Sequence, residues 1–265
     1  MSDFIWYNGH WLSGRQAALN ARDRIRLGDG VFDTMLSVGG QAIYAEHHFK
    51  RLKESCAIMG IPFTMGQHSF NGVVADLIRR NKATDARYAV NTLVTRGAGV
   101  RGLMPADDVT PSVILMIAKA PAPEDFPPVH AIIAQTVRRN EGSPLSRIKS
   151  CNYGDNILAL NEAKQRGANE AILLNNAGYV TCASAGNLLV AMGTRLYTPP
   201  LSDGVMNGIQ RSHLVTQSKV EERSLLPDDL KNAEALYLVN SIRGITPIVK
   251  LEGADLPRKP ASHFL

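Results

Sequence analysis

The segment Arg147–Tyr153 reads RIKSCNY and holds the residue with the clearest chemical potential. Lys149 lies between a strand pattern and a helix pattern, beside the apolar Ile148 and the hydrogen-bonding side chains of Asn152 and Tyr153. An amine that is removed from water has a lowered pKa and becomes able to form a Schiff base. A lone lysine is more often simply solvated. The residues alone therefore leave both alternatives open for Lys149.

Two turns have the residue types of an anion site. Gly208 opens a helix pattern that continues through Ile209, Gln210 and Arg211, and the start of a helix presents free backbone N–H groups to an anion. The polar turn Asn240–Gly244 follows an apolar strand pattern, and backbone donors can converge there too. A phosphate fits both turns. A helix start without a ligand and an ordinary loop are the alternatives.

A glycine loop carries two cations. Residues 97–102 read GAGVRG and match the letters of the dinucleotide fingerprint GxGxxG, but no helix pattern follows, so the sequence argues against a nicotinamide site. Arg96 and Arg101 on this loop are suited to hold a carboxylate. A solvated surface loop is the alternative.

Neither metal chemistry nor disulfide chemistry is indicated. His47 and His48 are adjacent, so on a helix they point about 100° apart and cannot chelate one metal together. Cys56, Cys151 and Cys182 form no CxxC or finger spacing. The sequence predicts no metal, free thiols and a reducing compartment.

The charge balance favours a small anionic ligand. Lys and Arg number 29 against 24 Asp and Glu, a net charge of +5, and the basic residues are scattered along the chain. Scattered cations argue against nucleic acid as a partner, whereas a few well-placed arginines suffice for a small anion. The sequence contains no apolar run of membrane-spanning length and does not begin like a signal peptide. We expect a cytoplasmic protein without a membrane partner.

The periodicities predict an α+β fold with two domains. The proline-rich stretch 119–128 is typical of an extended linker between an N-terminal α+β domain (1–118) and a C-terminal domain (129–265) that carries Lys149. The predicted elements are a hairpin over 4–12, helices over 46–61 and 69–80, strands over 88–95, 112–118, 129–137 and 170–174, a helix over 156–166, a strand at 179–180 and a helix from 207.

The ordered motifs resemble the fold-type IV pyridoxal-phosphate enzymes, a family that includes branched-chain and D-amino-acid aminotransferases and aminodeoxychorismate lyase. The resemblance covers nearly the whole chain. Segments 95–102 and 240–247 are most similar to the lyase. The motifs are Asp23-Arg24, 28–34 (GDGVFDT), His48 with Arg51-Leu52, 149–153 (KSCNY), 167–171 (GANEA), Asn187, 198–200 (TPP) and 208–211 (GIQR).

The resemblance implies pyridoxal 5′-phosphate as cofactor and a homodimer. It makes Lys149 the residue that bonds to the cofactor and moves protons. It also implies two further groups of residues. Cofactor contacts are expected from Arg51, Ile209, Gln210 and Ser241 at the phosphate, Tyr153 near the phenolic oxygen and Cys182 near the ring nitrogen, and substrate contacts from Arg96 or Arg101, Thr34 and Asn240.

Cys182 departs from the family pattern. The family usually has Glu at this position, and its carboxylate keeps the pyridine nitrogen of the cofactor protonated. A thiol is a poorer partner unless it is ionised. Transamination depends on the resulting electron sink more than an elimination that ends in an aromatic ring. Cys182 is therefore expected to shift the chemistry toward a lyase.

The resemblance implies an aminodeoxychorismate lyase of folate biosynthesis, which eliminates pyruvate from 4-amino-4-deoxychorismate to give p-aminobenzoate. One alternative is an aminotransferase for D- or branched-chain amino acids. The other is a protein that binds pyridoxal phosphate with impaired catalysis, which Cys182 motivates.

Overall fold

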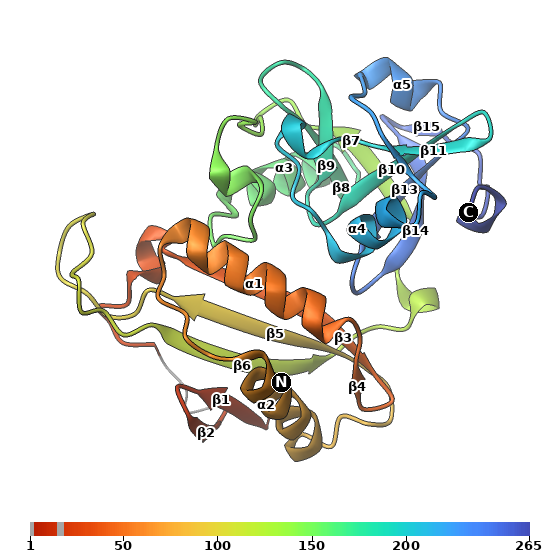
Figure 1. Ribbon diagram of the computed structural model, residues 1–265. Helices are drawn as coiled ribbons and strands as arrows, with labels where there is room; N and C mark the ends of the chain where they lie inside the picture. The colour runs from red at the N-terminus through yellow and green to blue at the C-terminus, as the bar shows by residue number, and fades with distance from the viewer. Residues whose placement is uncertain (1–2, 15–18) are drawn as a thin grey trace. The chain divides into compact units, whose positions relative to one another are not determined.

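The computed structural model describes residues 3–14 and 19–265, and the chain divides into two compact units. Unit 1 comprises Met1–Ala122 and Ile148–Cys151, and unit 2 comprises Pro123–Arg147 and Asn152–Leu265 (Figure 1). The division at Ala122 lies inside the expected linker. The sequence pattern assigns Lys149 to the C-terminal domain, whereas the structure groups its segment with unit 1, because that segment hydrogen-bonds to a strand of unit 1.

Unit 1 contains an antiparallel sheet with the strand order β2-β1-β6-β5-β3-β4. Its first two strands form the predicted hairpin, with Asn8 and Gly9 at positive φ in the turn, as an Asn-Gly hairpin requires. The strands are β1 (Phe4–Tyr7), β2 (His10–Ser13), β3 (Gly30–Val38), β4 (Gln41–Ala42), β5 (Arg87–Thr95) and β6 (Ser112–Lys119).

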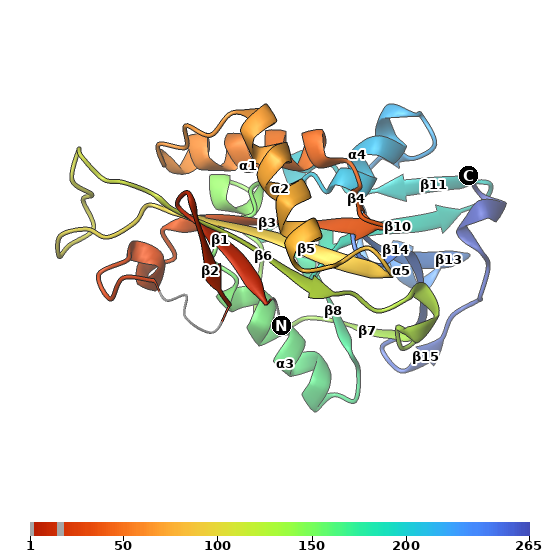
Figure 2. The ribbon, with the colours of Figure 1, turned by 90° about the horizontal axis from the view of Figure 1, so that it is seen from below.

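Helices α1 (Ala45–Met59) and α2 (Gln67–Arg80) lie on one side of β3, β5 and β6 (Figure 2). Phe49, Leu52 and Cys56 recur at helical spacing along α1 and are buried, so they form the stripe that faces the sheet. The chain leaves α1 at Gly60, whose φ of 64° suits a glycine cap. The sequence pattern for both helices is confirmed.

Unit 2 contains a mixed sheet with the order β12-β11-β10-β13-β14-β7-β8-β9, and β15 pairs with β14. Strand pairs β7–β8, β7–β14 and β11–β12 are parallel. The strands are β7 (Val129–Ile133), β8 (Glu170–Leu174), β9 (Val180–Ala183), β10 (Asn187–Met192), β11 (Arg195–Thr198), β12 (Glu221–Glu222), β13 (Ala235–Asn240), β14 (Gly244–Leu251) and β15 (Ala254–Asp255).

Both faces of this sheet are buried, because alternate residues of a strand enter different clusters. Leu188 and Val190 of β10 pack in one cluster, while Leu189 and Ala191 pack on the opposite face. Helix α4 (Ile209–Thr216) contributes Leu214 to that second cluster, and α3 (Gly154–Gln165) covers part of β8 through small alanines. A short helix, α5 (Pro227–Lys231), adds Leu230.

The predicted strand 129–137 is too long. Strand β7 ends at Ile133, because the backbone N–H groups of Gln135 and Thr136 donate to the Glu162 carboxylate instead of to a neighbouring strand. The mixed helix and sheet content confirms the α+β class. Within the part of the chain that the structure describes, no helix has the length and apolar character needed to cross a membrane.

Candidate active site

The backbone of Lys149 is fixed against the start of β3. Phe32 N donates to Lys149 O and Cys151 N donates to Gly30 O, each over 2.9 Å. The backbone at Gly30 packs closely, since a Cβ there would lie 3.0 Å from Val94 O and 3.3 Å from Cys151 Sγ. The sheet thus holds the lysine by main-chain bonds on a rigid element, which is how a reactive side chain is aimed.

The amine of Lys149 lies on the face of β3 opposite the helices. Its Nζ is 4.4 Å from the centre of the Phe32 ring, a cation–π contact. Thr34 follows two residues later and so shares this face, about 7 Å further along the strand. Asn91, its cross-strand partner, donates to Thr34 Oγ1 over 2.9 Å. The Lys149 amine and the oriented Thr34 hydroxyl therefore lie on one face of β3.

The other face of β3 carries a buried ion pair. Asp33 accepts from Arg51 Nε (2.8 Å) and Nη2 (2.9 Å), and lies 2.6 Å from His48 Nδ1. Burial alone would raise the pKa of Asp33, but the Arg51 charge and the bonds from His48 and Arg51 lower it to about 2. Asp33 thus orients Arg51, the arginine that the resemblance assigns to the phosphate.

Arg96 has a structural role. Its Nε donates to Asp29 (2.8 Å), and its Nη1 and Nη2 donate to Gly60 O and Met59 O (2.6 Å each). A buried guanidinium on the last carbonyls of α1 satisfies the end of that helix and its dipole. The three nitrogens of the Arg96 guanidinium thus donate to groups of the protein itself. Arg101 is exposed in the loop between β5 and β6 and remains the candidate for the substrate carboxylate.

In unit 2, the start of α4 is shaped by Asn187. Gly208 is the N-cap of the helix, and a Cβ at Gly208 would lie 2.1 Å from Asn187 Oδ1. Asn187 is buried and donates from Nδ2 to Met206 O over 2.9 Å, so it cannot easily withdraw. Only glycine brings the backbone this close, and the N–H groups of Ile209 and Gln210 follow in the first turn.

The turn between β13 and β14 lies at the same end of this sheet. Asn240 Oδ1 accepts from Ile242 N (3.0 Å) and Arg243 N (2.8 Å), and its Nδ2 donates to Ala185 O (3.2 Å). Through these hydrogen bonds, the side-chain amide of Asn240 fixes the conformation of the turn that carries Ser241. Because Asn187 pairs with Val239 in register, the α4 start and this turn belong to one edge of unit 2.

The donor set of this edge fits a phosphate. Helix N–H groups and the Ser241 hydroxyl donate without requiring a counter-charge, and the helix dipole favours an anion there. The backbone at Gly208 lies so close to Asn187 that a Cβ would fill the space between them. The residues present therefore fit the phosphate group of the implied cofactor.

Cys182 lies near this edge. It is buried in β9, opposite Leu173, and the next residue, Ala183, bridges to Gly186 just before β10. The hydroxyl of Thr181 is 3.7 Å from its sulfur and 2.8 Å from Leu173 O. Tyr153, the N-cap of α3, is half-buried and belongs to unit 2.

Sequence reasoning missed Phe32, Asn91 and the orienting roles of Asp33 and Asn187. The period of two along a strand was a usable signal, because residues 32 and 34 then share one face and residue 33 the other, as the burial pattern of β3 confirms. The contact of Asn187 with Gly208 joins residues 21 positions apart, which no spacing rule reveals.

Gly208→Ala is expected to weaken binding of the cofactor phosphate about tenfold, because the new methyl group displaces the Asn187 amide and with it the first turn of α4. Cofactor titration followed by absorbance measures the dissociation constant. Gly72→Ala is the matched control, since a methyl group on this glycine of α2 would meet no atom within 4 Å. Equal affinity in both variants would remove Gly208 from the phosphate site.

The family model described as amino-transferase class IV matches residues 30–251. A provisionally named branched-chain-amino-acid aminotransferase of Methanocaldococcus jannaschii is 28% identical over 98% of this chain and 92% of its own length. D-alanine aminotransferase of Bacillus licheniformis is 26% identical (95% and 89% covered), and aminodeoxychorismate lyase of Bacillus subtilis is 25% identical (94% and 86%).

Solved structures show the same architecture. A provisionally assigned 4-amino-4-deoxychorismate lyase of Legionella pneumophila superposes with a TM-score of 0.86 at 27% identity, covering 94% of this chain and 93% of that one. The branched-chain aminotransferase of Escherichia coli gives 0.92 at 22% identity (99% and 91%). A hypothetical aminotransferase of Mycobacterium tuberculosis in its pyridoxal-phosphate-bound form gives 0.85 at 25% identity (98% and 94%).

Proposed function

Since this chain belongs to the amino-transferase class IV family, whose enzymes depend on pyridoxal 5′-phosphate, we propose that it is an aminodeoxychorismate lyase. The reaction divides 4-amino-4-deoxychorismate into p-aminobenzoate and pyruvate, and no amino acceptor takes part. The finer features predicted from the sequence, a cytoplasmic location and a homodimer, stay predictions.

The observation that carries the proposal is that Lys149, which lies over the Phe32 ring, and Thr34 are on the same face of β3. Asn91 donates to Thr34 Oγ1, so the hydroxyl hydrogen of Thr34 can be donated onward. An elimination needs a base at the carbon that loses its proton and an acid at the leaving oxygen. An amine and a hydroxyl on the same strand face meet both requirements.

The bound cofactor would supply an electrophilic carbonyl and an electron-accepting ring. Lys149 would accept the proton of the amine-bearing ring carbon at its Nζ. Thr34 would donate its hydroxyl hydrogen to the ether oxygen of the departing three-carbon group, which leaves as the enol of pyruvate, and Thr34 would regain a proton from the Lys149 ammonium. The α4 N-terminus and Ser241 would hold the phosphate with Arg51, Tyr153 and Cys182 would lie beside the cofactor ring, and Arg101 would hold a substrate carboxylate.

The second candidate is an aminotransferase for D- or branched-chain amino acids. The names of the relatives from Bacillus licheniformis and Methanocaldococcus jannaschii favour it. An aminotransferase returns the proton to the substrate or cofactor and needs a keto acid to complete its cycle. It has no requirement for an acid at a leaving oxygen, so the Thr34 hydroxyl is the feature that favours the lyase.

The test supplies the cofactor-loaded protein with 4-amino-4-deoxychorismate and no keto acid, and follows p-aminobenzoate by chromatography. A second reaction supplies D-alanine or leucine with 2-oxoglutarate. Formation of p-aminobenzoate supports the lyase. Turnover only in the second reaction assigns the aminotransferase, and cofactor binding without turnover in either assigns a cofactor-binding protein with impaired catalysis.

Cys182→Glu is expected to raise aminotransferase activity about tenfold relative to lyase activity, because a carboxylate at this position would hold a proton on the cofactor ring nitrogen. The ratio of the two kcat/KM values is the measurement. Cys182→Gln is the matched control, since it adds the same bulk to the buried site without the charge. Aminotransferase activity that is equal with Cys182 and with Glu would refute the role assigned to the thiol.

A further inference from the structure

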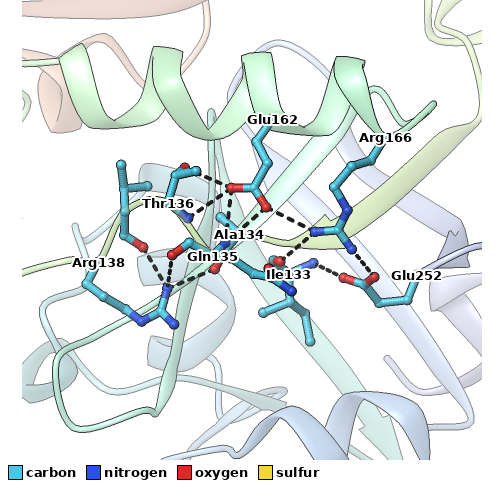
Figure 3. Close-up of polar contacts among 9 residues, drawn as sticks. Ile133, Ala134, Gln135, Thr136, Arg138, Glu162, Arg166 and Glu252 are labelled. Atoms are coloured by element: carbon cyan, nitrogen blue, oxygen red, sulfur yellow. Dashed lines mark hydrogen bonds and ion pairs between the residues drawn. The ribbon is translucent and has the colours of Figure 1, made fainter.

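The irregular segment 134–147 joins β7 to the segment of Lys149, and both of its ends are anchored within unit 2. At its start, the Glu162 carboxylate of α3 accepts from Gln135 N (3.0 Å), Thr136 N (3.0 Å) and Thr136 Oγ1 (2.8 Å), as Figure 3 shows. Burial would raise the pKa of Glu162, but the bonds from Thr136, Gln135 and Arg166 lower it to about 2. This charged clamp fixes the first residues of the segment.

Arg139, in the middle of the segment, anchors the far end through Ser146. Its backbone N–H donates to Leu174 O at the end of β8 over 2.9 Å. Its side chain then makes two bonds in different directions, because Nε donates to Gly204 O over 3.2 Å and Nη2 donates to Ser146 O. One planar guanidinium therefore joins two loops that are 58 residues apart in the sequence.

Each of these loops leads to a part of the proposed site. Ser146 is buried and precedes Lys149 by three residues, and Gly204 precedes the helix N-cap Gly208 by four. Gly204 has a φ of 85°, and a Cβ there would lie 2.9 Å from Cα of Glu141. The two loops are thus in close contact at the point where Arg139 bonds to both.

We propose that Arg139 is a positioning residue, whose guanidinium holds together, within unit 2, the end of the chain that leads to Lys149 and the loop that leads to the α4 N-terminus. The inference rests on the proposed function, because it assigns Lys149 and Gly208 to the same cofactor. A side chain that donates to one carbonyl only would leave the other loop unheld. Hydrogen bonds from a charged donor are among the stronger ones in proteins, so removing those of Arg139 is expected to have a measurable effect on cofactor binding.

The test compares Arg139→Met with Arg138→Met. Arg138 is the matched control, since its Nη1 donates to the carbonyls of Ala134, Gln135 and Val137 within its own loop (Figure 3). Pyridoxine 5′-phosphate has no aldehyde and cannot bond to Lys149, so its dissociation constant measures binding at the phosphate site without that bond. Pyridoxal 5′-phosphate also reports the bond to Lys149, through its visible absorbance and through borohydride trapping followed by peptide mass spectrometry.

In Arg139→Met, we expect pyridoxine 5′-phosphate to bind about tenfold more weakly and the Lys149 adduct to form about tenfold more slowly, with both values unchanged in Arg138→Met. Unfolding of the two apoproteins by urea is expected to occur at similar concentrations. Unchanged binding and adduct formation in Arg139→Met would overturn the inference. The inference would also be overturned if binding and adduct formation decreased only in proportion to a decrease in the stability of the apoprotein.

Arg139→Lys keeps the positive charge and replaces Arg139→Met in both measurements if the methionine variant does not fold. It is expected to show a smaller loss in both measurements, because an ammonium lacks the planar fork. Wild-type values in Arg139→Lys would show that the fork is not needed and overturn the inference. Failure of the wild-type protein to trap the cofactor on Lys149 would count against the proposed function itself, independently of Arg139.

Discussion

Lys149→Ala is expected to lower kcat/KM at least a hundredfold, for whichever of the two reactions the wild-type protein performs. In the proposed reaction the amine bonds to the cofactor and moves the proton, and main-chain bonds to β3 hold the Lys149 backbone in place. The same variant is expected to lose borohydride trapping at this position. Initial rates with saturating cofactor provide the measurement.

Lys149→Arg is the informative companion to the alanine variant. It keeps a cation over the Phe32 ring but supplies no amine that can bond to the carbonyl of the cofactor. Both variants are therefore expected to be inactive, with the arginine variant closer to the wild type in stability. Activity above about a hundredth of the wild type in either variant would exclude covalent catalysis by Lys149.

Asp33→Asn is expected to lower the free energy of unfolding of unit 1 by about 3 kcal/mol, because removing one partner of a buried ion pair leaves the Arg51 charge uncompensated. The side chain of Asp33 is 2% exposed, so water does not replace the lost charge. Urea unfolding followed by tryptophan fluorescence reports unit 1, since Trp6 and Trp11 both lie in its hairpin.

The pH dependence of this loss follows from the lowered pKa of Asp33. A carboxylate whose pKa falls from 3.8 to about 2 on folding stabilises the protein above pH 4, and this contribution of about 2 kcal/mol is lost as the pH falls from 4 to 2. The wild type and Asp33→Asn are therefore expected to differ most above pH 4, and the difference is expected to shrink from about 3 to about 1 kcal/mol as the pH falls to 2.

Asp76→Asn provides the control for Asp33→Asn. Asp76 pairs with Arg79 on the surface of α2, where both side chains are exposed, so the expected loss is below about 0.5 kcal/mol at every pH. A similar small loss in Asp33→Asn would mean that the buried pair does not stabilise unit 1. A large loss that persists unchanged at pH 2 would mean that the Asp33 charge is not its cause.

Most secondary structure could be predicted because it depends on local patterns. The Asn8-Gly9 turn, the apolar spacing of α1 and the run Glu170–Leu174 each contain their own signal, and the structure has the hairpin, the helix and β8 as expected. The predicted strand 129–137 was wrong at its end, since the Glu162 side chain that takes its backbone donors lies 26 residues away.

The same distinction between local patterns and long-range contacts applies to the candidate site. The sequence by itself determined the α+β class and the family, because residue types in a fixed order carry that information, and the role of Lys149 stays a prediction. Only the tertiary structure decided that Arg96 caps α1, that Arg51 is oriented by Asp33, that Gly208 is shaped by Asn187 and that Arg139 joins two loops. Whether an arginine binds a ligand or supports the fold depends on which carbonyls and carboxylates the fold brings within hydrogen-bond distance of its nitrogens. For Arg51 and Arg96, the paired carboxylates lie 18 and 67 residues away in the chain.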